Sequence, residues 1–121
     1  MTASAESLAI AAQALSAAAE KLATDPLLID VSDKLGIADL FVIVSGANPR
    51  QVGAIVEAIE DRLDQSGVLG WRREGERQDP WVLIDCFDTV IHVMEREARV
   101  VYALERLWKD CPLIEVPFSQ G

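Results

Sequence analysis

The sequence predicts one α/β domain of the α+β kind, in which a single mixed β-sheet of about five strands has helices packed against it. Three observations lead to this fold class. The chain has 121 residues, half of them hydrophobic, which suits one domain with one core. Apolar residues recur at helical spacing in three segments. Between these segments lie short β-branched runs that are punctuated by glycine and proline.

The first half of the chain predicts a helix followed by two strands. Leucines and alanines recur at helical spacing over residues 6–23, and Pro26 prevents the helix from continuing. Residues 27–31 predict a short strand. Residues 40–46, LFVIVSG, form a continuous apolar run of the kind that is buried on both faces, so this strand should lie in the middle of the sheet.

A second helix should begin after Asn48, which is a good N-cap, with Pro49 at the first helical position. One side of this helix carries valines, isoleucines and a leucine, and the other carries carboxylates. Gly67 follows the last periodic residue, as a C-terminal glycine does. The second helix should therefore pack one apolar stripe onto the sheet.

Three strands and a helix are expected in the second half, with the strands at residues 70–73, 81–85 and 89–94. The last helix should begin near Glu95 and end at Asp110, with Val101, Tyr102 and Leu107 among its inward residues and its alternating charges facing solvent. The domain should span residues 1–112, and residues 113–121 are expected to form a loose C-terminal tail.

The charge and the cysteine content restrict the class of protein. A formal net charge of −9 speaks against a nucleic-acid-binding surface and favours a basic partner or simple solubility. Cys86 and Cys111 form no CxxC motif, which is typical of reduced thiols in a cytoplasmic protein. The N-terminus does not follow the pattern of a signal peptide, and no apolar run is long enough to span a bilayer.

The stretch WVLIDCFDTVIHVM, residues 81–94, predicts a β-hairpin with one unusual face. If Cys86 and Phe87 are the central residues of a tight turn, one face of the hairpin mixes an indole, an imidazole and two carboxylates with a leucine and a methionine, which is unusual for a core face. If helices cover only the other side of the sheet, this face meets solvent and becomes a candidate partner surface. The expected pairs on it are Asp85 with Asp88, Leu83 with Val90 and Trp81 with His92, and Met94 shares the face.

Catalysis and metal binding are the alternatives for the same hairpin. Asp85 and Asp88 placed opposite each other would repel, which favours keeping a proton on one of them as a general acid. No nucleophile with a partnered base accompanies them, and both are more simply turn residues. His92 with one of these aspartates could contact a metal, but zinc sites usually use more than one His or Cys. We therefore predict no catalytic residue, no metal and no cofactor.

A glycine loop at residues 44–50, VSGANPR, lies between a strand and a helix N-terminus and could bind phosphate. It has neither a Walker lysine nor a GxGxxG pattern, so a plain strand-to-helix turn is favoured.

Four segments in a fixed order resemble the ribosomal silencing factor family, also called the RsfS or Iojap family. They are LIDVSDKLGIADLFVIVSGANPRQV, REGE, WVLIDCFDTVIHVMEREAR and YALERLW, and the resemblance covers roughly residues 8–112. It implies a nucleotidyltransferase-like topology and a non-enzymatic regulator in the cytoplasm. Such a regulator binds the large ribosomal subunit through a basic L14-type protein and hinders subunit joining when nutrients are short. The resemblance also implies a homodimer when free, and organelle relatives are linked to large-subunit assembly.

The resemblance also implies which residues bind the partner. Carrying over the family's hairpin gives four of them, the Glu-Gly step before it gives two, and strand alternation adds the last two. Two departures from the family pattern are the turn at Cys86-Phe87 and the segment EREAR at residues 95–99. The predicted partner-binding residues are Trp81, Asp85, Asp88 and His92, then Glu74 and Gly75, then Leu83 and Met94.

Three functions remain open from the sequence: a blocker of subunit joining, a large-subunit assembly factor, and a nucleotide-binding enzyme of the nucleotidyltransferase type. The first two need no cofactor, no membrane and no sequence-specific nucleic acid. The sequence leaves open the dimer interface and the signal that starts silencing. The partner-binding hypothesis requires that Trp81 and its cross-strand neighbours point outward.

Overall fold

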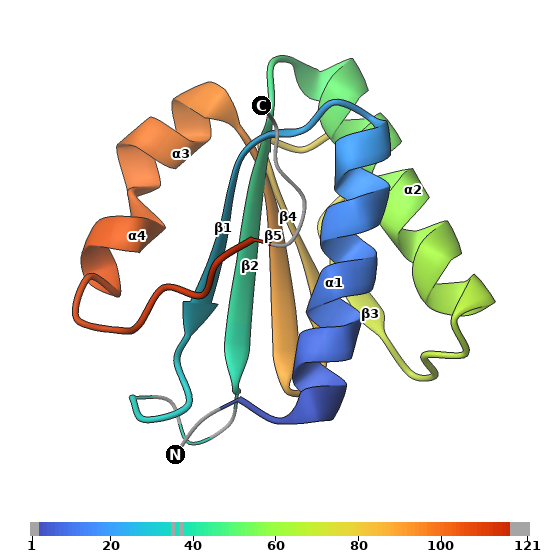
Figure 1. Ribbon diagram of the computed structural model, residues 1–121. Coiled ribbons are helices and arrows are strands. Elements are labelled where there is room, and N and C mark those ends of the chain that lie inside the picture. The colour runs from blue at the N-terminus through green and yellow to red at the C-terminus, as the bar shows by residue number, and fades with distance from the viewer. Residues whose placement is uncertain (1–2, 35, 37, 117–121) are drawn as a thin grey trace.

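A five-stranded mixed sheet forms the centre of the protein, in a computed structural model that describes residues 3–34, 36 and 38–116. The strand order is β1-β2-β5-β4-β3, in which β2 and β5 are parallel and the other neighbours are antiparallel. This confirms the predicted fold class. The elements, drawn in Figure 1, are α1 (Ala5–Glu20), β1 (Thr24–Asp30), β2 (Leu40–Gly46), α2 (Pro49–Gln65), β3 (Arg72–Glu74), β4 (Trp81–Cys86), β5 (Thr89–Glu95), α3 (Arg96–Tyr102) and α4 (Leu104–Leu107).

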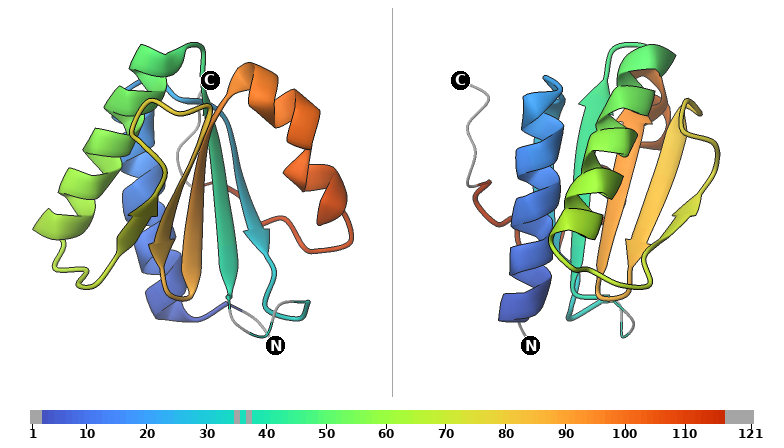
Figure 2. Two further views of the ribbon diagram at one scale, coloured as in Figure 1. Left: turned by 180° about the vertical axis from the view of Figure 1, so that it is seen from behind. Right: turned by 90° about the vertical axis from the view of Figure 1, so that its right-hand side faces the viewer.

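Two helices, α1 and α2, lie side by side on one face of the sheet (Figures 1 and 2). Ser4 caps α1 by accepting from the Ser7 N–H, and Asn48 caps α2 by accepting from the Gln51 N–H. The apolar stripe expected on α2 is present and packs against alanines of α1 and against the sheet. Its fully buried members are Val52, Ile55, Val56, Ile59 and Leu63.

The second face of the sheet is covered over only part of its width. α3 and α4 lie over the β1–β2 side of the sheet (Figure 2). They bury Ile43 and Met94 against Ala98 and Leu104. All seven residues of β2 are buried, which confirms its predicted central position.

The hairpin turn differs from the predicted register by two residues. Phe87 and Asp88 are its central residues, and Cys86 pairs with Thr89 at its base. Phe87 takes the left-handed conformation, with φ of +68°, and its N–H donates to Asp85 Oδ1 at 2.9 Å. Cys86 is buried in the core instead of lying in the turn. A shift of two residues leaves the strand side chains on their expected faces. The predicted pair of Asp85 with Asp88 was wrong, because Asp88 lies in the turn and Asp85 pairs with Val90. The observed pairs are Trp81 with Met94, Leu83 with His92 and Asp85 with Val90.

The last helix is interrupted, which the sequence did not predict. Ala103 has φ of 45° and ψ of 53°, so α3 ends there and α4 begins in a new direction. The helical spacing had placed Val101, Tyr102 and Leu107 inward, but all three are exposed.

Part of the expected loose tail is bound to the sheet. Leu113 forms an isolated bridge with Ile29, and the Ile114 N–H donates to the Leu28 carbonyl at 2.8 Å. The interpretation of residues 113–116 as loose was therefore wrong, and residues 117–121 lie outside the described part of the chain. Within the described residues, no helix has the length and apolar character needed to cross a bilayer.

Replacing Ile59, which is fully buried on α2, should lower the free energy of unfolding. Ile59→Ala removes buried methyl and methylene groups and leaves a cavity, at a cost of about 2–5 kcal/mol. Val101→Ala, at a position 75% exposed on α3, should cost less than about 0.5 kcal/mol. Urea denaturation of both variants tests this. Equal losses would show that the α1–α2 layer is not the principal core.

Candidate partner-binding site

Trp81 is the first residue of β4 and lies half-buried on the partly covered face of the sheet. Its indole Nε1–H donates to His92 Nδ1 at 3.1 Å. The ring of Tyr102, at the end of α3, packs against the indole with the centroids 4.8 Å apart. The indole is therefore held in a fixed orientation from two sides, while part of it remains open to a partner.

His92 is only 4% exposed, so the prediction that it lies on the surface was wrong. The ring of Phe41 meets it edge-on at 4.8 Å. Burial lowers the pKa of His92 from 6.5 to about 4, so the imidazole is neutral at physiological pH. Because Nδ1 accepts the indole proton, the ring proton is assigned to Nε2, which has no hydrogen-bond partner among the described residues. His92 therefore orients Trp81 and does not itself form the surface.

Met94 is fully buried, and the expectation that it lines the surface was also wrong. It pairs with Trp81 across the hairpin and belongs to the core under α3. The sequence argument assumed that helices cover one face only. α3 and α4 cover the β2 side of the second face as well, and they leave β4 open (Figure 2).

A groove of about 400 Å³ lies on this open part of the sheet. Leu83 and Asp85 are half-buried in its lining, and Arg72 pairs with Asp85 across the β3–β4 ladder. Apolar side chains with one carboxylate and one guanidinium suit recognition of a protein side chain. The residues that line the groove are Ala38, Phe41, Gly70, Arg72, Leu83, Asp85, Phe87, Val90 and His92.

Glu74 and Gly75, predicted from the Glu-Gly step, lie beside this groove. Glu74 pairs with Leu83, which pairs in turn with His92, so the three residues cross the sheet in one row. Both Glu74 and Gly75 are exposed. Asp88 is exposed at the tip of the hairpin, where its carbonyl accepts from the Asp39 and Leu40 N–H groups at 2.7 and 3.1 Å.

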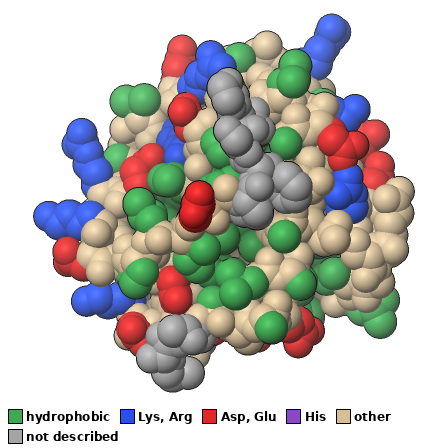
Figure 3. Space-filling view, viewed as in Figure 1, with side chains coloured by type: hydrophobic (Ala, Val, Ile, Leu, Met, Phe, Trp, Pro, Cys, Tyr) green, Lys and Arg blue, Asp and Glu red, His purple; other side chains and the backbone are tan. Residues whose placement is uncertain are grey.

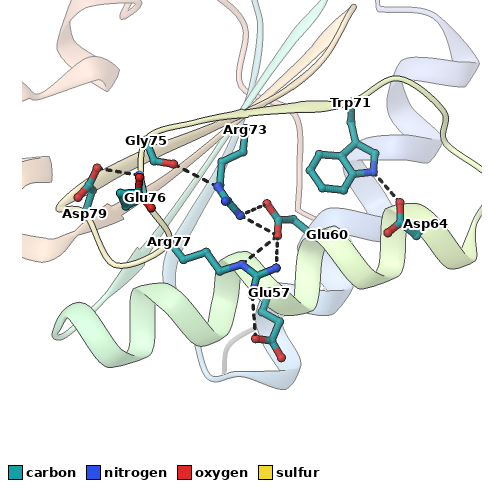
Figure 4. A network of polar contacts seen from close by, with 9 residues as sticks. All are labelled: Glu57, Glu60, Asp64, Trp71, Arg73, Gly75, Glu76, Arg77 and Asp79. Atoms are coloured by element: carbon teal, nitrogen blue, oxygen red, sulfur yellow. Dashed lines mark hydrogen bonds and ion pairs between the residues drawn. The ribbon is translucent and has the colours of Figure 1, made fainter.

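An ion-pair network fixes the loop that follows Glu74 (Figure 4). The Glu60 carboxylate, on α2, is 3% exposed and accepts from Arg73 Nη1 at 2.8 Å and from Arg77 Nη2 at 3.0 Å. Arg73 Nε also donates to the Gly75 carbonyl at 3.1 Å. One buried carboxylate therefore holds both arginines, and through them the loop, against α2.

The structure thus brings together Glu74, Trp81, Leu83 and Asp85 on one open face, with Asp88 at its end. Sequence reasoning missed Phe41, Arg72 and Tyr102, which line or flank the same surface. Tyr102 is exposed at the end of α3, next to the break at Ala103, and nothing in the sequence pattern signals that break. Among the described residues, no three His, Cys, Asp or Glu side chains are arranged to hold a metal ion.

Comparison with known families agrees with the motif order. The family described as "Ribosomal silencing factor during starvation" matches residues 4–120. The chain belongs to the RsfS family. It is 38% identical over 108 residues to the ribosomal silencing factor RsfS of Bacillus subtilis, a match that covers 89% of this chain and 92% of that protein.

Two further similarities place the RsfS chain among more distant proteins. It is 33% identical over 93 residues to the mouse protein named "Mitochondrial assembly of ribosomal large subunit protein 1", covering 71% of this chain and 39% of that protein. A crystal structure of a protein from Bacillus halodurans superposes with a TM-score of 0.74 at 33% identity, covering 85% of this chain and 93% of that one. The chain therefore shares its family and its fold with proteins from other organisms over most of its length.

Removing the charge of Glu60 should loosen the loop next to Glu74. Glu60→Gln leaves two guanidinium groups without a buried carboxylate and should lower the free energy of unfolding by about 1–3 kcal/mol. This is less than the loss expected when a fully buried ion pair is broken, because both arginines reach solvent. Glu57→Gln, which removes an exposed carboxylate 3.3 Å from Arg77, should cost less than about 0.5 kcal/mol. Urea denaturation and amide hydrogen exchange over residues 74–79 measure both effects. Equal protection of that loop in the two variants would contradict the anchoring role of Glu60.

The depressed pKa of His92 makes stability depend on pH in a defined window. Below pH 6.5 the unfolded chain protonates His92, whereas the folded chain resists protonation until about pH 4. Above pH 6.5 His92 is neutral in both states and its titration does not lower stability, whereas the free energy of unfolding falls as the pH drops from 6.5 towards 4. The pKa difference corresponds to a total loss of about 3 kcal/mol. His92→Gln keeps a side-chain acceptor but does not titrate. The unfolding free energy of the wild type should therefore fall more steeply than that of the variant between pH 6.5 and 4, and parallel curves would exclude this role.

Proposed function

We propose that this RsfS-family chain binds a basic L14-type protein of the large ribosomal subunit through the open face of β4. By occupying that position it would block joining of the small subunit and so lower translation in nutrient shortage. The observation that carries the proposal is the Trp81 indole, which is fixed by His92 and Tyr102 beside an apolar groove.

The chemistry of this face suits a basic protein partner. A preoriented aromatic side chain loses little conformational freedom on binding, which is typical of a binding hot spot. Asp85 adds a carboxylate in the groove, Glu74 adds one beside it, and Asp88 adds one at the tip of the hairpin. A net charge of −9 would steer the chain towards a cationic surface. Occupancy alone produces the block, so the mechanism needs no catalytic residue.

The rest of the proposal follows the family. The chain would act in the cytoplasm and would be a homodimer when it is not on the ribosome. A role in large-subunit assembly is the second candidate, because the mouse relative is named for that process. The two roles use the same docking surface and differ in the particle that is bound.

Trp81→Ala should weaken binding to purified large subunits by about tenfold to a hundredfold, because an anchoring indole commonly contributes 2 kcal/mol or more. Trp71→Ala is the matched control. Trp71 is also half-buried, but it packs against the α1–α2 core and donates to Asp64 Oδ1 at 2.8 Å. Co-sedimentation of both folded variants with large subunits measures the difference. Equal binding by the two variants would remove this face as the docking site.

Ribosome profiles distinguish the two candidate roles. In cells that lack the protein, a blocker predicts normal large subunits and a failure to repress translation on starvation. An assembly factor predicts that precursor particles of the large subunit accumulate during growth.

A further inference from the structure

A second concave site lies on the other side of α3 from Trp81, and the docking surface does not use it. It is a cavity of about 650 Å³ between β1, the end of β2 and the α3–α4 pair. This volume is in the range of small-molecule sites. Its lining residues are Asp25, Pro26, Leu27, Ser45, Arg96, Arg99, Val100, Ala103, Glu105 and Arg106.

The topology favours a ligand at this end of the sheet. β2 and β5 are parallel neighbours, so their carboxyl ends, at Gly46 and Glu95, lie next to each other. The chain that leaves β2 forms α2 on one face, whereas the chain that leaves β5 forms α3 on the opposite face. Crevices that open where adjacent parallel strands send their connections to opposite faces are common ligand sites. Ser45 and Arg96 lie at the two strand ends that border the cavity.

The cavity is rich in positive charge on a protein that is strongly negative. Three of the eleven Lys and Arg residues, Arg96, Arg99 and Arg106, line it, although the chain carries a net charge of −9. Figure 3 shows several Lys and Arg side chains along the α3–α4 side of the molecule, at the left of that view. Guanidinium groups bind phosphate oxygens with paired, charge-assisted hydrogen bonds.

Arg99 lies at the base of the cavity, and hydrogen bonds already hold its side chain in place. It is 8% exposed, and its Nη1 donates to Ser45 Oγ at 2.9 Å and to the Asp25 carbonyl. Its Nε donates to Glu105 Oε2 at 3.1 Å. No hydrogen bond occupies Nη2 among the described residues. The guanidinium is therefore held rigidly, and one nitrogen remains available for a ligand.

Arg96 and Arg106 supply the charge that Glu105 does not neutralise. Both are exposed at the cavity. Arg96 Nε contacts Thr24 Oγ1 at 3.4 Å, and its terminal nitrogens have no partner in the described part of the chain. Arg106 has no side-chain hydrogen bond there either. Two carboxylates also line the cavity: Glu105 is paired with Arg99, and Asp25 is exposed to water.

We propose that this cavity binds the phosphate group of a small phosphorylated molecule through Arg96, Arg99 and Arg106. Ser45 is a positioning residue, because it is fully buried and orients Arg99. Pro26, Leu27, Val100 and Ala103 give the rest of the ligand an apolar wall. The site is separate from the docking face, so the proposal does not depend on ribosome binding.

Calorimetry on the full chain tests the site with three probes: inorganic phosphate, adenosine monophosphate and adenosine. The phosphate-bearing probes should bind saturably and adenosine should not. Combining Arg96→Gln with Arg106→Gln should weaken binding by at least about tenfold, because each substitution removes a charge-assisted hydrogen bond to the anion. Arg72→Gln is the matched control, since Arg72 is an exposed arginine in β3 at the opposite edge of the sheet.

The outcomes separate the possible ligands. Equal affinity for inorganic phosphate and adenosine monophosphate supports a site for the free ion, whereas tighter binding of the nucleotide supports a phosphate ester. The proposal is overturned if neither inorganic phosphate nor adenosine monophosphate binds saturably up to about 10 mM, because a dissociation constant above that concentration is too weak for a specific site. The proposal is also overturned if the folded double variant binds the phosphate-bearing probes as tightly as the wild type, or if Arg72→Gln loses as much affinity as the double variant. It is overturned as well if only ribosomal RNA competes for the site.

Discussion

The complete burial of β2 is the constraint from which the rest of the architecture follows. A central strand of apolar, β-branched residues must be covered on both faces. α1 and α2 cover one face, so the chain after β5 has to supply cover for the other. The α3–α4 pair is short and covers only the β1–β2 side. The border of that cover places Trp81 half in and half out of the core, next to an open strip of sheet.

The faces of the hairpin could be predicted from the sequence, but its pairing could not. Strand alternation depends only on local geometry, and it placed Trp81, Leu83 and Asp85 together correctly. The pairing depends on the turn, where Phe87 adopts a left-handed conformation that glycine usually supplies. The imidazole of His92 packs against the rings of Phe41 and Trp81, and no periodic pattern reveals the contact with Phe41, which is distant in sequence.

The left-handed break at Ala103 is a second local feature that the sequence did not predict. No glycine or proline lies at the break, so the helical spacing predicted one continuous helix through Ala103. The break places Tyr102 against Trp81 on one side of α3 and brings Glu105 to Arg99 on the other. The charges of this segment, interpreted from the sequence as a solvated helix face, thus line a concave surface. One local change of backbone direction therefore shapes both surfaces that carry the proposals.

The parallel pairing of β2 with β5 also has a consequence for how the chain folds during synthesis. Leu40 pairs with Thr89 and Gly46 with Glu95, so 49 residues separate each strand residue from its partner. The first half of the chain can form α1, β1, β2 and α2, but one side of β2 stays unpaired until β5 has been made. Closing so long a loop is slow compared with forming a hairpin. A chain emerging from the ribosome would therefore expose an apolar strand edge until about four-fifths of it has been translated, which makes that interval the point of greatest exposure to aggregation.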